Sequence, residues 1–244
     1  MSELPSTDNE HRTADNAQCA IDNGPVAAAD LFPARIFGAD VRTFQRLLKS
    51  AGLLSGPVDG IFGPQTASAA ELFDELYQQL RAKYGALDAR SEAAIRTLLP
   101  RAQELARRSI NAIRKTGIDA RIISGTRSYV EQDKLYAKGR GAPGPRVTNA
   151  RGGQSNHNFG IGWDIGIFDA NGKYLADSFL YQKAGRMVLA AFGPPKGGTP
   201  SSPSIPVEWG GEWRRFPDVS HYQLRTGLAL AETRCRFEAG ESLV

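Results

Sequence analysis

Two short segments of the chain hold the residues whose types and spacing could do chemistry. Of the three histidines in the sequence, His157 and His221 stand among glycine, asparagine, aspartate and tryptophan residues. Asp164 follows His157 by seven residues, with Gly160 and Gly162 between them. Because glycine disfavours a helix, we expect the first histidine on a loop that faces the aspartate on a following strand.

An imidazole and a carboxylate are suitable zinc ligands, and His221 in the second segment would supply a third. Three protein ligands leave one position of a tetrahedral site open for water, as in catalytic zinc sites. Zinc lowers the pKa of such a water to about 7, and a nearby carboxylate must then take its proton. Asp218 lies three residues before His221 and is our candidate for that base. The sequence thus predicts His157, Asp164 and His221 as metal ligands.

Each of these residues also has an ordinary structural explanation. Histidines can be hydrogen-bonded core residues, and aspartates often cap turns. The combination of four such residues with the glycine spacing favours the metal site over that explanation.

A strand must position the aspartate. Residues 163–168 alternate so that the carboxylate of Asp164 points away from an apolar face, and residues 169–172 are a turn signal for a hairpin. The other elements expected here are strands over 120–124 and 219–224, helices over 129–138 and 179–192, and a short C-terminal helix. This mixture predicts an α+β fold with a small, mainly antiparallel sheet.

The front of the chain reads as helical. Apolar residues recur at helical spacing after Asp40, a good N-cap, up to Gly52. A turn-rich connector follows over 56–64, in which we expect Phe62 to be a core residue, and Thr66 is expected to cap a second helix ending near residue 73.

Residues 71–117 are expected to be helical for most of their length. Gly85 interrupts this stretch, Asp88 can cap the helix that follows, and Pro100 either kinks it or starts a new one. Residues 193–206 are rich in glycine, proline and serine and predict a surface loop near the site.

Charge is unevenly distributed along the 244 residues. Residues 1–30 contain six acids and one base. Because the whole chain has a net charge of +4, the remaining residues are strongly basic. We expect a flexible acidic tail over 1–34. A basic body suits a polyanionic partner or simply aids solubility, and no nucleic-acid motif accompanies the dispersed basic residues.

The spacing of Cys19 and Cys235 suggests neither a metal knuckle nor a disulfide, so we expect free thiols. No apolar run reaches the roughly 18 residues of a membrane span, and the first residues do not resemble a secretory signal. We therefore expect a protein made in the cytoplasm that needs another route to any external target. We also expect a monomer.

The pattern Ser155-x-His157-x-x-Gly160-x-Gly162-x-Asp164, followed by Asp218-x-x-His221, resembles the M15 metallopeptidases. This family includes D-Ala-D-Ala carboxypeptidases and dipeptidases and the phage-type L-alanyl-D-glutamate endopeptidases. The match extends over about 87–235 and takes in Ser124-Gly125-Thr126-Arg127-Ser128, Gln132 and Trp209-Gly210-Gly211-Glu212-Trp213. The resemblance implies a compact α+β domain that holds zinc on a small antiparallel sheet.

Carried over by position, the resemblance implies His157, Asp164 and His221 as zinc ligands. It further implies Asp218 as general base and Arg127 as the cation that stabilises the oxyanion, a role that suits a fixed, forked charge. A surface salt bridge is the alternative for Arg127. Ser155 and Trp213 are implied as substrate contacts, although Ser155 could equally be a simple turn residue.

An aspartate base preceded by a Trp-Gly-Gly-x-Trp element resembles the L-alanyl-D-glutamate branch, because the other branches usually use glutamate there. Gly162 departs from the commoner alanine and could widen the site, and the 193–206 segment looks like an insertion. Both departures bear on the shape of the substrate groove.

The front segment also resembles a family. Its Val41-x-x-Phe44-Gln45-x-x-Leu48 pattern and the Asp59-Gly60-Ile61-Phe62-Gly63-Pro64 turn are similar to the helical peptidoglycan-binding domain fused to many wall hydrolases. The expected layout is an acidic tail over 1–34, a wall-binding domain over 35–80, a peptidase domain over 86–236 and a C-terminal tail over 237–244.

The leading hypothesis is a zinc peptidoglycan endopeptidase that cuts the stem peptide at L-Ala–D-Glu. The alternatives are a D,D-carboxypeptidase on stem peptides and a non-catalytic wall-binding protein. The missing signal fits an endolysin released through membrane holes, which we prefer, and also fits an exported interbacterial toxin.

Overall fold

A computed structural model of the 244-residue chain describes residues 40–193 and 205–243. The predicted acidic tail, with Cys19, and most of the predicted 193–206 loop lie outside these ranges. Cys235 is exposed and free. Within the described ranges, no helix combines the length and apolar character needed to cross a bilayer.

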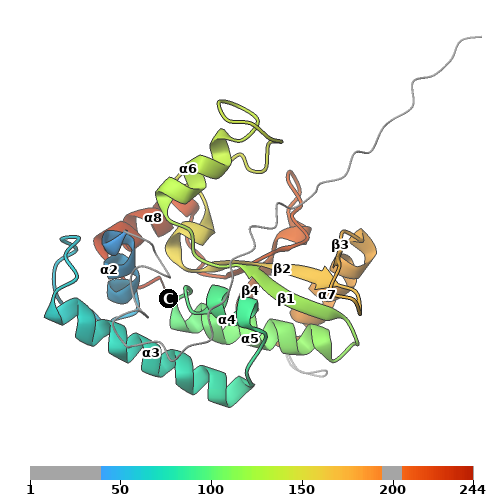
Figure 1. Ribbon diagram of the computed structural model, residues 1–244, viewed down its shortest axis with the longest axis horizontal. Helices are drawn as coiled ribbons and strands as arrows, with labels where there is room; N and C mark the ends of the chain where they lie inside the picture. The colour runs from blue at the N-terminus through green and yellow to red at the C-terminus, as the bar shows by residue number, and fades with distance from the viewer. Residues whose placement is uncertain (1–39, 194–204, 244) are drawn as a thin grey trace, which may run out of the picture.

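The described chain begins with a run of helices, and its later helices are interspersed with the strands of a small sheet (Figure 1). The helices are α2 (Val41–Ser50), α3 (Pro64–Tyr84), α4 (Ala89–Ile95), α5 (Pro100–Arg114), α6 (Tyr129–Ala137), α7 (Ser178–Phe192) and α8 (Leu230–Ala239), with 3-10 turns η2 (Asn156–Phe159) and η3 (Gly210–Glu212). The strands are β1 (Asp119–Ser124), β2 (Gly162–Phe168), β3 (Tyr174–Leu175), β4 (Val207–Trp209) and β5 (His221–Leu224). The fold is α+β, as predicted.

The sheet is antiparallel throughout, in the order β1-β2-β5-β4, and β3 pairs with the end of β2 as the predicted hairpin. β5 begins two residues later than expected. Asp218 and Ser220 form a turn instead, in which the Asp218 carboxylate accepts a hydrogen bond from the Ser220 backbone N–H at 3.1 Å.

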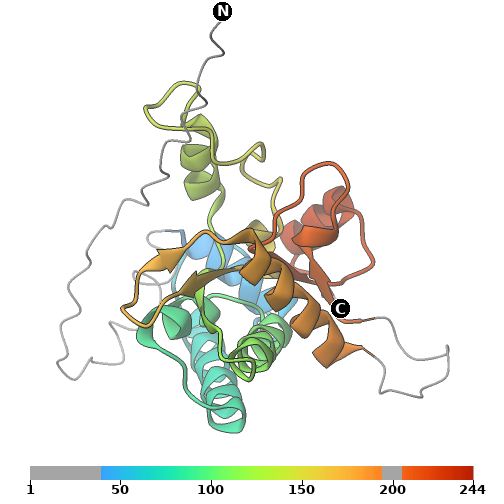
Figure 2. The ribbon, with the colours of Figure 1, turned by 90° about the vertical axis from the view of Figure 1, so that its right-hand side faces the viewer.

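The two faces of the sheet differ in character. Helices α4, α5 and α7 cover one face, while α6 and the loop after it rise on the other side (Figures 1 and 2). The covered face buries apolar side chains such as Trp163, Ile165 and Tyr222, all at 0% exposure. Because side chains alternate along a strand, their neighbours Asp164 and His221 face the opposite side.

The caps of two helices are confirmed. Asp40 caps α2 by accepting a hydrogen bond from the Thr43 N–H at 3.0 Å, and Asp88 caps α4 in the same way through Ser91 at 3.0 Å. Pro100 starts a new helix, α5, rather than kinking an existing one.

The predicted start of the second helix is wrong. Helix α3 begins at Pro64 with Gly63 as its N-cap, since proline has no N–H that needs a partner at the first position. Thr66 is not a cap; its hydroxyl accepts a hydrogen bond from the amide of Gln45 at 3.1 Å. Phe62 is 38% exposed and not a core residue, because Gln45 holds the turn before it through its own polar contacts.

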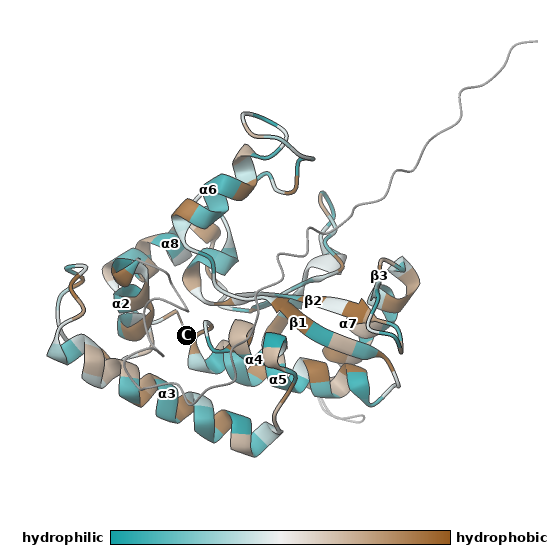
Figure 3. Ribbon diagram, viewed as in Figure 1, coloured by the Kyte–Doolittle hydropathy of each residue, from teal (hydrophilic) through white to brown (hydrophobic). Residues whose placement is uncertain are grey.

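Helix α3 continues past the expected end near residue 73 to Tyr84, so it joins the helix expected from residue 71, and Gly85 ends it as predicted. Its colours mix along the whole length in Figure 3, as expected for a helix with one face in the core. The helix therefore extends beyond the predicted end of the wall-binding domain at residue 80.

A single hydrophobic cluster runs through both predicted domains. It contains Phe44 and Leu47 of α2 together with Leu99 and Phe159 of the later part. Phe237 is also buried in this cluster, so the core extends into the predicted C-terminal tail. The domain boundaries themselves stay a prediction.

Candidate metal centre

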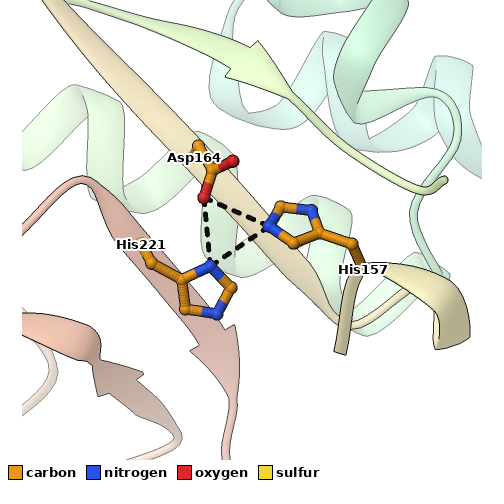
Figure 4. Close-up of side chains that lie close together, drawn as sticks. All are labelled: His157, Asp164 and His221. Carbon is orange, nitrogen blue, oxygen red and sulfur yellow. Dashed lines mark hydrogen bonds and ion pairs between the residues drawn. The ribbon is translucent and has the colours of Figure 1, made fainter. Parts of the chain in front are cut away.

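Three side chains converge on one point above the open face of the sheet (Figure 4). His157 Nε2 lies 3.1 Å from Asp164 Oδ1 and 3.1 Å from His221 Nδ1. His221 Nδ1 lies 3.0 Å from the same Asp164 oxygen. The three ligand atoms therefore form a nearly equilateral triangle.

Strand pairing and a short turn create this convergence. Asp164 on β2 lies directly opposite His221 on β5, so both side chains leave the sheet on one face. His157 arrives on η2, which Gly160 ends in the left-handed region at φ 70°. A Cβ on Gly162 would lie 3.1 Å from the His221 ring and from the His157 backbone N, so glycine leaves room for both ligands.

The hydrogen bonds of the two imidazoles fix where their protons reside. His157 Nδ1 lies 2.7 Å from the carbonyl oxygen of Gly125, and His221 Nε2 lies 3.1 Å from the side-chain oxygen of Gln223. Both partners are acceptors, so each of these ring nitrogens carries the proton. The other nitrogen of each neutral ring then presents a lone pair.

Two imidazole lone pairs and a carboxylate oxygen thus point at one another. With both rings neutral no proton lies between them, and an arrangement of three acceptors at this distance is unfavourable unless a cation joins them. The edges of the triangle allow one ion to sit about 2.0–2.2 Å from each atom, the range of zinc–nitrogen and zinc–oxygen bonds. The residues present therefore fit a metal ion.

The electrostatics of the three side chains agree with this interpretation. Burial lowers the pKa of His157. Burial also disfavours the charged form of His221, but the hydrogen bond and charge of Asp164 outweigh it and raise the pKa of His221. Burial is likewise outweighed at Asp164, whose pKa lies well below its usual value because of the two histidines. The negative charge of Asp164 therefore favours positive charge at this point of the site.

Arg127 joins the cluster from the segment between β1 and α6. Its Nη2 lies 3.2 Å from the second carboxylate oxygen of Asp164, and its Nη1 donates to the side-chain oxygen of Gln132 at 3.0 Å. Burial lowers the pKa of Arg127, while the charge of Asp164 acts in the opposite direction. The guanidinium is thus held rigidly beside the three candidate ligands.

Asp218 lies next to the cluster on the exposed side. Its backbone carbonyl accepts a hydrogen bond from the His221 N–H at 3.2 Å. Its carboxylate is exposed and accepts hydrogen bonds from Ser220, and its charge contributes to the raised pKa of His221. This carboxylate is near the triangle without being one of its corners.

The two predicted substrate contacts lie in different settings. The ring of Trp213 is 5.2 Å from the His221 ring, and its indole N–H donates to Glu208 at 2.7 Å. Ser155 is half-buried just before η2, and its hydroxyl has no hydrogen-bond partner among the described residues. The roles of both remain predictions.

Sequence reasoning missed several polar residues that support the cluster. Asn158 is fully buried and holds the backbone carbonyl of Arg127. Gln132, which belongs to the matched pattern but had no predicted role, is also fully buried and holds the Arg127 side chain. Gln223 contacts His221, and the signal for it was available because residues two apart on a strand share a face. No comparable signal exists for Asn158, whose partner is 31 positions away in the sequence.

Comparisons with known proteins place these features in context. Residues 96–192 match the family model described as VanY, D-alanyl-D-alanine carboxypeptidase. Residues 37–81 match the model of a peptidoglycan binding domain. The predicted resemblance is confirmed.

A curated relative is the peptidoglycan L-alanyl-D-glutamate endopeptidase CwlK of Bacillus subtilis (strain 168), 35% identical over 109 residues. The aligned region is 44% of this chain and 62% of the relative, so the chain spans about three fifths of that protein's length.

Among solved structures, the Serratia marcescens L-Ala D-Glu endopeptidase ChiX matches with a TM-score of 0.41 and 24% identity. That match covers 58% of this chain and 90% of the other. A TM-score this low bears on neither substrate nor mechanism.

Proposed function

We propose that this protein is a zinc-dependent peptidoglycan hydrolase that cleaves the stem peptide, with His157, Asp164 and His221 as the zinc ligands. The observation that supports this most strongly is the convergence of three lone pairs at 3.0–3.1 Å. Three protein ligands of this type with an open fourth position are characteristic of catalytic zinc.

The chain's own residues then have distinct tasks. Zinc, when bound, would act as a Lewis acid and lower the pKa of the attacking water. Asp218 accepts the proton of that water and passes it to the leaving amine. Arg127 stabilises the developing oxyanion, and its contacts to Asp164 and Gln132 hold it in place beforehand.

The proposed scissile bond is L-Ala–D-Glu. The aspartate base and the Trp-Gly-Gly-x-Trp element support it, and so does the description of the curated relative as an L-alanyl-D-glutamate endopeptidase. The match of residues 96–192 to a D-alanyl-D-alanine carboxypeptidase model supports the alternative, removal of a terminal D-Ala.

Mass spectrometry of products from purified peptidoglycan separates the two activities. Release of free stem peptides that begin with D-Glu is the expected result. Loss of only a terminal D-Ala would transfer the protein to the carboxypeptidase alternative. No product from zinc-loaded protein would favour the non-catalytic wall-binding alternative.

We further propose that residues 37–81 bind peptidoglycan and that the enzyme acts on the wall outside the cytoplasmic membrane, as an endolysin rather than an exported toxin. Sedimentation of the full-length Asp218→Asn variant with purified sacculi tests the binding. The variant should co-sediment without degrading the wall, and failure to co-sediment would remove the wall-binding role.

A further inference from the structure

We infer that Gln223 is a positioning residue for the metal centre, and that Asn156 in turn holds Gln223. The inference rests on the proposed metal site. Gln223 selects the ring nitrogen that His221 offers to the metal, and the pair forms a chain of side-chain contacts from η2 to β5.

The geometry requires one orientation of the Gln223 amide. Its Oε1 accepts a hydrogen bond from Asn156 Nδ2 at 2.6 Å and lies 3.1 Å from His221 Nε2. A flipped amide would set its NH₂ group against the NH₂ group of Asn156. The oxygen therefore faces His221, and His221 Nε2 must carry the proton.

This proton position determines metal binding by His221. With the proton on Nε2, the lone pair of Nδ1 points at His157 Nε2 and Asp164 Oδ1. A proton on Nδ1 would instead occupy the place of the metal. The Gly125 carbonyl likewise holds the proton of His157 on Nδ1, which leaves the lone pair of Nε2 for the metal. Each ring thus has its own acceptor, as metal-binding histidines usually do.

Gln223 meets His221 at the edge of a cavity. Asn156 and Gln223 both line a cavity of about 310 Å³ that also contacts Glu208 and Thr226, whereas the Trp213 ring, 5.2 Å away, is an aromatic neighbour of His221. Among the described residues, Gln223 Oε1 is the acceptor that lies within hydrogen-bond distance of His221 Nε2.

The test compares the zinc affinity of full-length variants by chelator competition. Gln223→Leu removes the acceptor at similar volume and should bind zinc about 10–100-fold more weakly, the usual effect of losing such a partner. Gln223→Glu keeps an acceptor oxygen and should stay within a few-fold of the wild type. Gln103→Leu is the matched control, because Gln103 in α5 is also buried but its amide donates to the Leu98 carbonyl just before that helix, and it should bind zinc normally.

A folded Gln223→Leu variant with wild-type zinc affinity would overturn the inference. If that variant does not fold, Asn156→Ala gives a second test, since freeing the Gln223 amide should weaken zinc binding several-fold, and an unchanged affinity would again contradict the inference. Absence of zinc binding by the wild type would instead defeat the proposed function itself.

Discussion

Asp218 and Arg127 flank the three candidate ligands but are held in different ways. Arg127 is fixed by Asp164 and Gln132 in the interior of the site. The Asp218 carboxylate is exposed, and its hydrogen bonds within the described residues come from Ser220 in its own turn. An exposed, locally held carboxylate suits a group that exchanges protons with water, whereas a rigid cation suits a fixed charge.

Asp218→Asn should therefore lower kcat by about 10²- to 10⁴-fold, the usual contribution of a general base. Zinc affinity should stay close to that of the wild type, because Asp218 is not a corner of the triangle. Rates of stem-peptide release and metal content per chain measure the two quantities. A variant that retains full kcat would exclude Asp218 as the base.

At the residue scale, the sequence predicted the groups with distinctive chemistry. Two histidines and an aspartate with glycines between them are an unusual combination, and the structure brings them together. The supporting roles of Gln223 and Asn158 were not predicted, because amide side chains are common in any sequence. Their roles come from the residues that they contact in the folded chain.

At the element scale, the turn that carries His157 packs directly on the front of the molecule. Gly160, at its end, adopts a left-handed φ of 70°, and a Cβ there would lie 2.6 Å from a methyl carbon of Leu47 in α2. The Gly160 carbonyl also accepts a hydrogen bond from the Leu99 N–H at 2.8 Å. The position of His157 therefore depends on α2 as well as on the sheet.

Gly160→Ala should destabilise the protein by about 2–4 kcal/mol, from the unfavourable φ and the overpacking together. Gly172→Ala is the matched control, because Gly172 has a similar φ of 77° but nothing within 4 Å of its Cβ position. Its cost should be limited to about 1 kcal/mol of backbone strain. Urea unfolding of both variants measures the difference, and equal losses would mean that the contact with Leu47 has no energetic weight.

Local signals predicted the elements with side-chain caps and the hairpin but not the start of α3. Asp40 and Asp88 cap their helices because a carboxylate can satisfy a free backbone N–H. Thr66 looked equivalent by residue type. Its hydroxyl is instead used by Gln45 from another helix, a tertiary contact that local spacing does not encode.

At the scale of the whole molecule, a buried ion pair connects three helices. Arg107 of α5, at 0% exposure, binds both carboxylate oxygens of Glu92 in α4 at 2.9 and 2.6 Å. Tyr77 of α3 donates to the same carboxylate at 2.8 Å. Burial and Glu92 together raise the pKa of Tyr77 to about 12, so it stays a neutral donor.

The free energy of unfolding should depend on pH through the carboxylate of Glu92 in this network. Burial raises the pKa of Glu92, but the hydrogen bonds from Arg107 and its neighbours lower it overall below the usual 4.5. A lowered folded-state pKa stabilises the protein above the unfolded-state value, and this contribution is lost as the pH falls through the folded-state value.

Glu92→Gln should cost about 3–5 kcal/mol at pH 7, because a buried guanidinium loses its countercharge. The difference from wild type in unfolding free energy should shrink below pH 4.5, the usual pKa of the glutamate, as the wild-type carboxylate protonates. Urea titrations of both proteins at several pH values measure it. A difference that is constant with pH would show that Glu92 is not held as a charged partner.

Helical periodicity and turn residues mark where helices lie, but they do not tell whether two modules share a core. Phe44 and Leu47 are both fully buried in the same cluster as Leu99 and Phe159. The sequence suggested two consecutive modules, while the structure packs them around one hydrophobic interior.

A chain that begins at residue 86 should therefore be far less stable than the full-length protein, because removing α2 and α3 uncovers Leu99 and Phe159. Thermal unfolding and zinc binding of this fragment test the expectation. An independently folded fragment with full zinc affinity would show that the front helices act only as an attached binding module.

The central claim is that His157, Asp164 and His221 hold the metal that enables cleavage of the wall peptide. The most direct measurement is release of muropeptides by the full-length protein after removal of metal with a chelator and after addition of stoichiometric zinc, alongside the Asp164→Asn variant. We predict that the wild type loses its activity with the metal and regains it with one zinc per chain, while the variant neither retains zinc nor releases peptides. Undiminished release by metal-free wild type, or by the variant, would contradict the account.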